Sequence, residues 1–381
     1  MIPLLRTHLD RWALPLGLLG LAAVAVYNAR LWPRDRAFLA ARPEPQPLPP
    51  LEAWPDLPLV SVLVAAWNEA AHVERHIASF QALRYPHKEL VLCAGGDDGT
   101  YALASRLAGP AVRVLRQAPG EGKQRALARA FPEARGEIIF LTDADCLLAD
   151  EPFERTLWPV AAGAEQVTTG GSRPFDQQLA DPFVFTQAAA PLYASLHGPE
   201  YASGILGRNC AARRALLAQT AALDAPAPTG TDYVLAKTLL ATGARIRHAP
   251  ESLMPTEYPT TARAYLRQQR RWLRNVALHG RRFGALDEAR ASLQSSLVGL
   301  AMLLWPGLGL LLSPWLLAVW GILVGQALFA RLRYLSFAGA VLKRPVQPAD
   351  VSWQGPLLLL DFVAWAQPLV DYLRSQDRWR W

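Results

Sequence analysis

Residues 137–145 read Glu-Ile-Ile-Phe-Leu-Thr-Asp-Ala-Asp, an apolar run that leads directly into Asp143 and Asp145. Such a run predicts a strand that is buried on both faces of a parallel sheet. Because side chains alternate along an extended chain, the two carboxylates point to the same side. Oxygen ligands at a strand end suit Mg²⁺ or Mn²⁺ bridging a diphosphate. Taken alone, however, two aspartates in this spacing are more often a solvated turn.

Outward from this strand, extended and helical patterns alternate. The predicted strands are 59–66, 89–94, 112–115 and 137–142, and the predicted helices between them are 69–83, 100–108 and 123–131. This alternation predicts an α/β domain with a mostly parallel, Rossmann-like sheet. Ligands of such domains bind at the carboxyl ends of the strands.

The composition is too apolar for a soluble enzyme. Of 381 residues, 51% are hydrophobic and 13 are tryptophan, and 39 basic against 32 acidic side chains leave a net charge of +7. This content excludes a disordered or collagen-like chain. The three cysteines cannot form a disulfide framework, and they fit a reducing compartment.

The apolar residues are concentrated in separate runs. Residues 12–29 and 291–330 carry no charge, and the second run is long enough for two spanning helices hinged near Pro306–Pro314. A further stretch, 351–370, has Asp361 as its one charged residue and could span, re-enter or lie in the interface. The expected organisation is an N-terminal anchor (1–41), a proline-rich linker (42–58), a catalytic domain (59–262), a basic interfacial helix (263–290) and a membrane region with two or three spans (291–381).

Basic residues predict the orientation. Arg6 and Arg11 precede the first apolar run, but a heavier basic flank, Arg30, Arg34, Arg36 and Arg42, follows it. By the positive-inside rule the middle domain is cytoplasmic. The basic segment 331–344 returns to the same side after a two-helix hairpin. We therefore expect an uncleaved anchor rather than a signal peptide, and an integral protein of a bacterial inner membrane.

Three further features carry candidate chemistry. Lys123 lies in a glycine-containing loop at a predicted helix start, where it can reach a phosphate. Asp232 precedes a helix expected to start near Tyr233, so it is either a functional carboxylate or an N-cap. Residues 263–282 contain seven arginines and no acid, and within them Gln268, Arg271 and Trp272 share one helical face. Such a helix is typical of an interface beside anionic headgroups.

In their order along the chain, these residues resemble the family 2 glycosyltransferases, specifically the membrane-integrated branch that includes cellulose and hyaluronan synthases and ceramide glucosyltransferases. The resemblance covers about residues 59–280. It rests on Trp67-Asn68-Glu69, Asp97-Asp98-Gly99-Thr100, Lys123, Asp143-Ala144-Asp145, Gly207-Arg208-Asn209 with Arg213, Thr231-Asp232 and the QxxRW motif Gln268–Trp272.

The resemblance implies a GT-A fold and inverting transfer from a UDP- or GDP-sugar. It assigns Asp145 to the metal, Asp143 to the ribose or donor sugar, and Asp232 to the general base. Gln268, Arg271 and Trp272 would lie at the diphosphate and the acceptor, where Arg271 would contact the diphosphate and Trp272 would stack at the acceptor entrance. Lys123 and Asp98 would hold the nucleotide, and Glu69 would line its pocket. Ala94-Gly95-Gly96 stands where the family usually has a base-reading aspartate, so the identity of the base is less secure.

Other patterns in the sequence do not indicate a different chemistry. His72 and His76 do not form a HExxH zinc motif, and we expect an exposed histidine pair. Cys146 and Cys210 are expected to be packing residues. Nucleic-acid binding is not expected, because the arginines cluster beside a membrane segment and no base-stacking motif accompanies them.

The favoured acceptor is a lipid or a lipid-linked glycan at the cytoplasmic membrane face, since three or four spans offer limited material for a polymer channel. A processive polysaccharide synthase is the alternative. A membrane-anchored nucleotidyltransferase would not need the QxxRW helix, and a non-catalytic scaffold would leave Asp143, Asp145, Asp232 and Arg271 unexplained.

Overall fold

The computed structural model describes residues 10–42, 47–54, 57–225, 227 and 229–374. These described residues form two compact units: one comprises those within 45–176 and 194–258, and the other comprises those within 10–42, 177–193 and 259–374. We call them the sheet unit and the helical unit. Arg6 and part of the predicted linker lie outside the described residues.

The sheet unit is built on seven strands in the order β3-β2-β1-β4-β6-β5-β7. The strands are β1 (Val60–Trp67), β2 (Lys88–Gly95), β3 (Val112–Arg116), β4 (Ile138–Asp143), β5 (Val167–Pro174), β6 (Cys210–Arg213) and β7 (Arg247–Thr256). Neighbours pair in parallel except at β6, which is antiparallel to both β4 and β5. The predicted α/β fold with a mostly parallel sheet is therefore confirmed.

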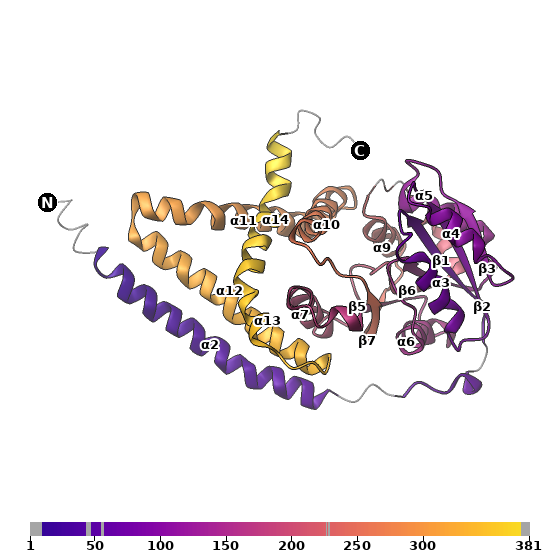
Figure 1. Cartoon of the computed structure of the whole chain (residues 1–381), viewed down its shortest axis with the longest axis horizontal. Helices are drawn as coiled ribbons and strands as arrows, with labels where there is room; N and C mark the ends of the chain where they lie inside the picture. The colour runs from indigo at the N-terminus through magenta and orange to yellow at the C-terminus, as the bar shows by residue number, and fades with distance from the viewer. Residues whose placement is uncertain (1–9, 43–46, 55–56, 226, 228, 375–381) are drawn as a thin grey trace. The chain divides into compact units, whose positions relative to one another are not determined.

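Helices cover both faces of this sheet (Figure 1). They are α3 (Val73–Ala82), α4 (Thr100–Arg106), α5 (Gly122–Ala130), α6 (Asp150–Ala161), α8 (Arg214–Thr220) and α9 (Thr231–Ala241). On one face Val62 and Phe140 pack with Phe153 of α6, and on the other Leu63 packs in a cluster with Leu127 of α5. Burial on both faces explains why β1 and β4 are almost continuously apolar.

The helical unit contains long helices from both ends of the chain. They are α2 (Ala13–Ala41), α10 (Ala262–Arg282), α11 (Leu286–Leu312), α12 (Pro314–Val341), α13 (Pro348–Ser352) and α14 (Gln354–Arg374), with most of α7 (Pro182–Leu196). Figure 1 shows α2 running along α12. A Cβ on Gly17 would lie 3.0 Å from that of Ala318, and one on Gly20 would lie 2.4 Å from Ile322. Small residues on α2 thus let the two backbones approach closely.

By length and composition, α2, α11 and α12 could each cross a membrane. The hairpin between α11 and α12 breaks at Ser313, whereas Pro306 lies inside α11. The predicted basic segment 331–344 begins within α12, where Arg331 pairs with Asp361 and Arg333 pairs with Asp35.

Candidate active site

The predicted carboxylates meet at the carboxyl edge of the sheet. Asp143 is the last residue of β4 and pairs in register with Ala65 of β1. The loops that carry Glu69 and Asp145 therefore leave the sheet at the same edge. This is the edge at which open α/β sheets bind ligands.

Lys123 links two of these carboxylates. It follows Gly122, whose φ of 71° suits glycine, and it lies in the first turn of α5. Its Nζ is 2.7 Å from Oδ1 of Asp143 and 3.1 Å from Oδ1 of Asp232. Burial lowers the pKa of Lys123, but the two carboxylates raise it by more, so the ammonium group stays charged.

Asp232 is not an N-cap. Helix α9 begins at Thr231, so Gly230 occupies the N-cap position and Asp232 is the second helical residue. Its carboxylate reaches Lys123, 109 positions earlier in the chain. Gly207 lies against it, since a Cβ there would be 2.0 Å from Oδ1 of Asp232. Position 207, directly before Arg208, is therefore glycine because a side chain there would collide with Asp232.

Asp145 lies among charged groups that act on it in opposite directions. Burial and the nearby Asp143 raise its pKa, while Arg208, a hydrogen bond from the Cys146 thiol and Lys123 oppose the rise. Arg208 also donates to Oγ1 of Thr256 at 3.2 Å. The sequence contained Arg208 within a motif, but its role as a counter-charge to Asp145 was not predicted, because nothing in the sequence shows that the two are close.

Glu69 is a second acid at this edge whose pKa is raised. Burial, followed by Asp145, Asp143, Glu257 and Asp98, raises its pKa to about 8. Its backbone N–H donates to Oγ1 of Thr100 at 2.7 Å, which connects the loops after β1 and β2. Glu69 is therefore largely protonated near neutral pH unless a cation occupies the site.

Asp98 accepts hydrogen bonds from the backbone after β1 and after β2. Its carboxylate accepts hydrogen bonds from the N–H of Ala70 at 2.9 Å and of Thr100 at 3.0 Å. Slight burial raises its pKa, but these bonds and the Thr100 hydroxyl lower it by more. Asp98 thus organises this edge, and its predicted contact with the nucleotide stays a prediction.

The missing aspartate after β2 has a steric explanation. A Cβ on Gly95 would lie 2.6 Å from the backbone oxygen of Gln117 and 2.8 Å from the Trp67 ring. Gly96, with φ of 116°, lies equally close to Asn68. No side chain fits at either position without moving its neighbours.

Burial tests the predictions for the two histidines and the two cysteines. The predicted exposed histidine pair is wrong: His76 is fully buried on the apolar face of α3 and its Nδ1–H donates to the carbonyl of Cys146 at 2.8 Å, while His72 pairs with Glu257. Burial lowers the pKa of His76. The expectation for Cys146 and Cys210 is confirmed, since both are buried free thiols.

Gln268, Arg271 and Trp272 lie in α10, as the predicted helix requires. This helix belongs to the helical unit, and the three roles toward diphosphate and acceptor stay predictions.

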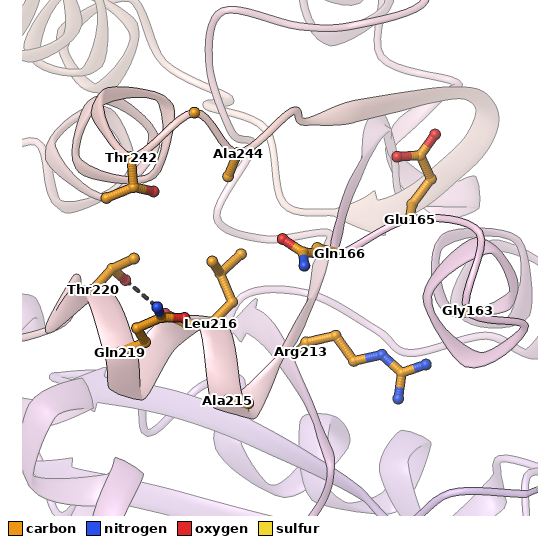
Figure 2. Close-up of a pocket in the computed structure, with 11 residues that line it drawn as sticks. Gly163, Glu165, Gln166, Arg213, Ala215, Leu216, Gln219, Thr220, Thr242 and Ala244 are labelled. Atoms are coloured by element: carbon orange, nitrogen blue, oxygen red, sulfur yellow. Dashed lines mark hydrogen bonds between the residues drawn. The ribbon is translucent and has the colours of Figure 1, made fainter.

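A cavity of about 650 Å³ in the sheet unit lies away from these acids. Figure 2 shows Glu165, Gln166 and Arg213 around it. Arg213 pairs with Ile138 at the start of β4, so it lies at the opposite end of that strand from Asp143. Although Arg213 is part of the resemblance, it is therefore not a member of this acidic site.

The mostly parallel sheet, with grouped charges at its carboxyl edge, matches the GT-A fold of glycosyltransferases that use nucleotide-sugars. The family model described as "Glycosyltransferase like family 2" matches residues 55–275, and the chain belongs to this family. This membership favours the glycosyltransferase over the nucleotidyltransferase and scaffold alternatives.

Curated relatives match over a short region. Beta-monoglucosyldiacylglycerol synthases from Nostoc sp. and Trichormus variabilis are 37% and 36% identical over 103 residues. The match covers 25% of this chain and 22% of each relative.

A solved structure is similar over nearly the whole chain. It is a mannosyltransferase from Pyrobaculum calidifontis in complex with GDP-Man and Mn²⁺, with a TM-score of 0.52 and 20% identity. The similarity covers 95% of this chain and 99% of the mannosyltransferase, and it shows a shared fold.

Proposed function

We propose that this chain transfers a sugar, with inversion, from a nucleotide-sugar to a lipid or lipid-linked acceptor at the cytoplasmic face of a membrane. The observation that carries the proposal is the bridge from Lys123 to Asp143 and Asp232. It joins a residue assigned to the donor with the residue assigned as general base.

In this mechanism Asp232 takes the proton of the acceptor hydroxyl as its oxygen attacks the anomeric carbon. One carboxylate suffices for a single displacement, because no covalent intermediate has to be resolved. The ammonium of Lys123 orients the Asp232 carboxylate through their 3.1 Å contact. Asp143 would hold the ribose or sugar of the donor, and Arg271 would bind its diphosphate through charge-assisted hydrogen bonds.

Mg²⁺ or Mn²⁺ fits the acids at this edge. Burial and Asp143 raise the pKa of Asp145, and burial and several neighbouring acids raise the pKa of Glu69, so a cation would relieve the repulsion among these acids. Among the described residues no three His, Cys, Asp or Glu side chains form a metal site by themselves. Asp145 would therefore hold the ion together with donor phosphates, and when bound the ion would neutralise charge on the departing diphosphate.

Two observations favour a lipid acceptor. Three helices are long and apolar enough to cross a membrane, and such spans would keep the enzyme beside membrane lipids. The curated relatives are named for synthesis of a glucosylated diacylglycerol, although only 22% of their length is matched.

The test is a screen of UDP- and GDP-hexoses against native membrane lipids with Mg²⁺ or Mn²⁺, with products identified by mass. We expect a lipid that has gained one or a few hexoses. The Asp232→Asn variant should lose about 10²–10⁴-fold in rate, the usual contribution of a general base. Transfer by this variant at the wild-type rate would refute the base assignment, and a long polymer would favour the processive alternative.

A further inference from the structure

One carboxylate in the helical unit connects three helices. Asp361 is the only charged residue between positions 351 and 370. One of its oxygens accepts a hydrogen bond from the hydroxyl of Tyr265 in α10, and the other accepts one from the guanidinium of Arg331 in α12. Both carboxylate oxygens are thus used, each by a different helix.

This arrangement is buried. The Asp361 side chain is 7% exposed and the Arg331 side chain is 15% exposed. A charge placed at such a position is costly unless it is paired and hydrogen-bonded, and removal of one partner leaves the other buried without compensation.

The hydrogen bond acts on the helix that carries the QxxRW motif. Tyr265 precedes Gln268 by three residues and Trp272 by seven, so the three side chains lie on one side of α10. Tyr265 is 6% exposed and packs against Phe183 of α7 with ring centroids 6.0 Å apart, whereas Trp272 is 41% exposed. The helix is therefore held at its first turn, and the motif begins about 4.5 Å further along the axis.

We propose that Asp361 is a positioning residue, which acts through Tyr265 to set the rotation and axial position of the segment Gln268–Trp272. The inference rests on the proposed function, because that function assigns Arg271 and Trp272 to diphosphate and acceptor. A carboxylate held by Arg331 gives Tyr265 a fixed acceptor, so α10 cannot turn about its axis without breaking a buried hydrogen bond. This accounts for a charged residue within an otherwise uncharged segment.

The test uses the full chain in detergent, with Asp361→Asn and Tyr265→Phe. The second variant removes only one hydroxyl and keeps the ring packing against Phe183. Trypsin reports on the helix directly, because α10 contains seven arginines at which cleavage can be located by mass. We expect both variants to be cleaved within 263–282 severalfold faster than wild type, and the double variant no faster than the stronger single variant.

A matched control is Asp35→Asn. Asp35 of α2 forms the other buried pair on α12, with Arg333 at 2.8 Å, and it also accepts a hydrogen bond from Tyr193 of α7 at 3.1 Å. This control removes a carboxylate of similar burial without touching α10, so cleavage within 263–282 should match wild type. Equal acceleration by the control would indicate general loosening of the unit and would overturn the proposal.

Kinetics separate positioning from stability. Both variants should lower kcat severalfold more than they alter the KM of the donor, while the control retains the wild-type ratio. Wild-type cleavage or wild-type kcat in both variants would overturn the proposal. Absence of transfer by the wild-type protein would refute the proposed function instead, and the cleavage comparison would still decide whether Asp361 positions α10.

Discussion

At the carboxyl edge of the sheet, one ammonium group balances two carboxylates from distant parts of the chain. Lys123 contacts Asp143 and Asp232 at 2.7 and 3.1 Å, and Arg208 similarly offsets the buried Asp145. The acids outnumber these cations locally, and they add to the effect of burial, which is the main reason why the pKa of Glu69 is raised. This excess of negative charge would stabilise a bound divalent ion or positive charge that develops in the transition state.

The glycine against Asp232 leads to a prediction. Gly207→Ala should lower the transfer rate by about 10²-fold, because a Cβ 2.0 Å from Oδ1 would displace the carboxylate and misplacement by about 1 Å can have that effect. Gly204→Ala is the control, since a Cβ there meets nothing within 4 Å. Rates of both variants should be measured alongside circular dichroism. A Gly207→Ala protein as active as the control would contradict the proposed place of Asp232.

Glu69 predicts a pH dependence of stability without metal. Its pKa of about 8 in the folded protein exceeds the ordinary value of 4.5, so the native state binds this proton more tightly. Stability from this group is therefore present below about pH 4.5 and is lost as the pH rises through about 8. Glu69→Gln should raise the Tm at pH 8.5 in EDTA and have a smaller effect at pH 5. An equal change in Tm at both pH values would refute this.

Close helix contacts lead to a prediction for the packing of α11 against α14. A Cβ on Gly299 would lie 2.7 Å from the backbone oxygen of Phe362 and 2.9 Å from the amide nitrogen of Ala366. Because backbone atoms cannot move aside locally, Gly299→Leu should destabilise the helical unit by about 1–3 kcal/mol. Gly307→Leu on the same helix meets open space and should leave the Tm in detergent unchanged. Similar losses in both variants would show that leucine itself is harmful in α11.

For the whole molecule, the three apolar helices lead to a prediction of topology. The chain should stay in the membrane pellet after a carbonate wash, because burial of even one spanning helix is effectively irreversible. With the sheet unit on the cytoplasmic side, trypsin should digest it in inverted vesicles and leave it intact in right-side-out vesicles. The opposite protection pattern would refute the predicted orientation.

Much of the sheet was predictable because its signals are local. The apolar runs that became β1, β2 and β4, and the acids after β4, lie within a few residues of one another in the chain. The uncharged runs likewise predicted α2, α11 and α12 by length and composition alone. Burial of His76 was not predicted, since it depends on which face of α3 packs against the sheet.

By itself the sequence determined the α/β alternation and the apolar helices, because these follow from periodicity and composition. The order of several motifs along the chain indicated glycosyl transfer through their resemblance to a family. Only the tertiary structure decided which charged side chains pair with one another. The Lys123–Asp232 contact spans 109 positions, and the buried pairs of Asp35 with Arg333 and of Asp361 with Arg331 join separate helices. Charges of this kind are stabilised by neighbours that are distant in the chain, and a linear pattern does not show which of them folding brings together.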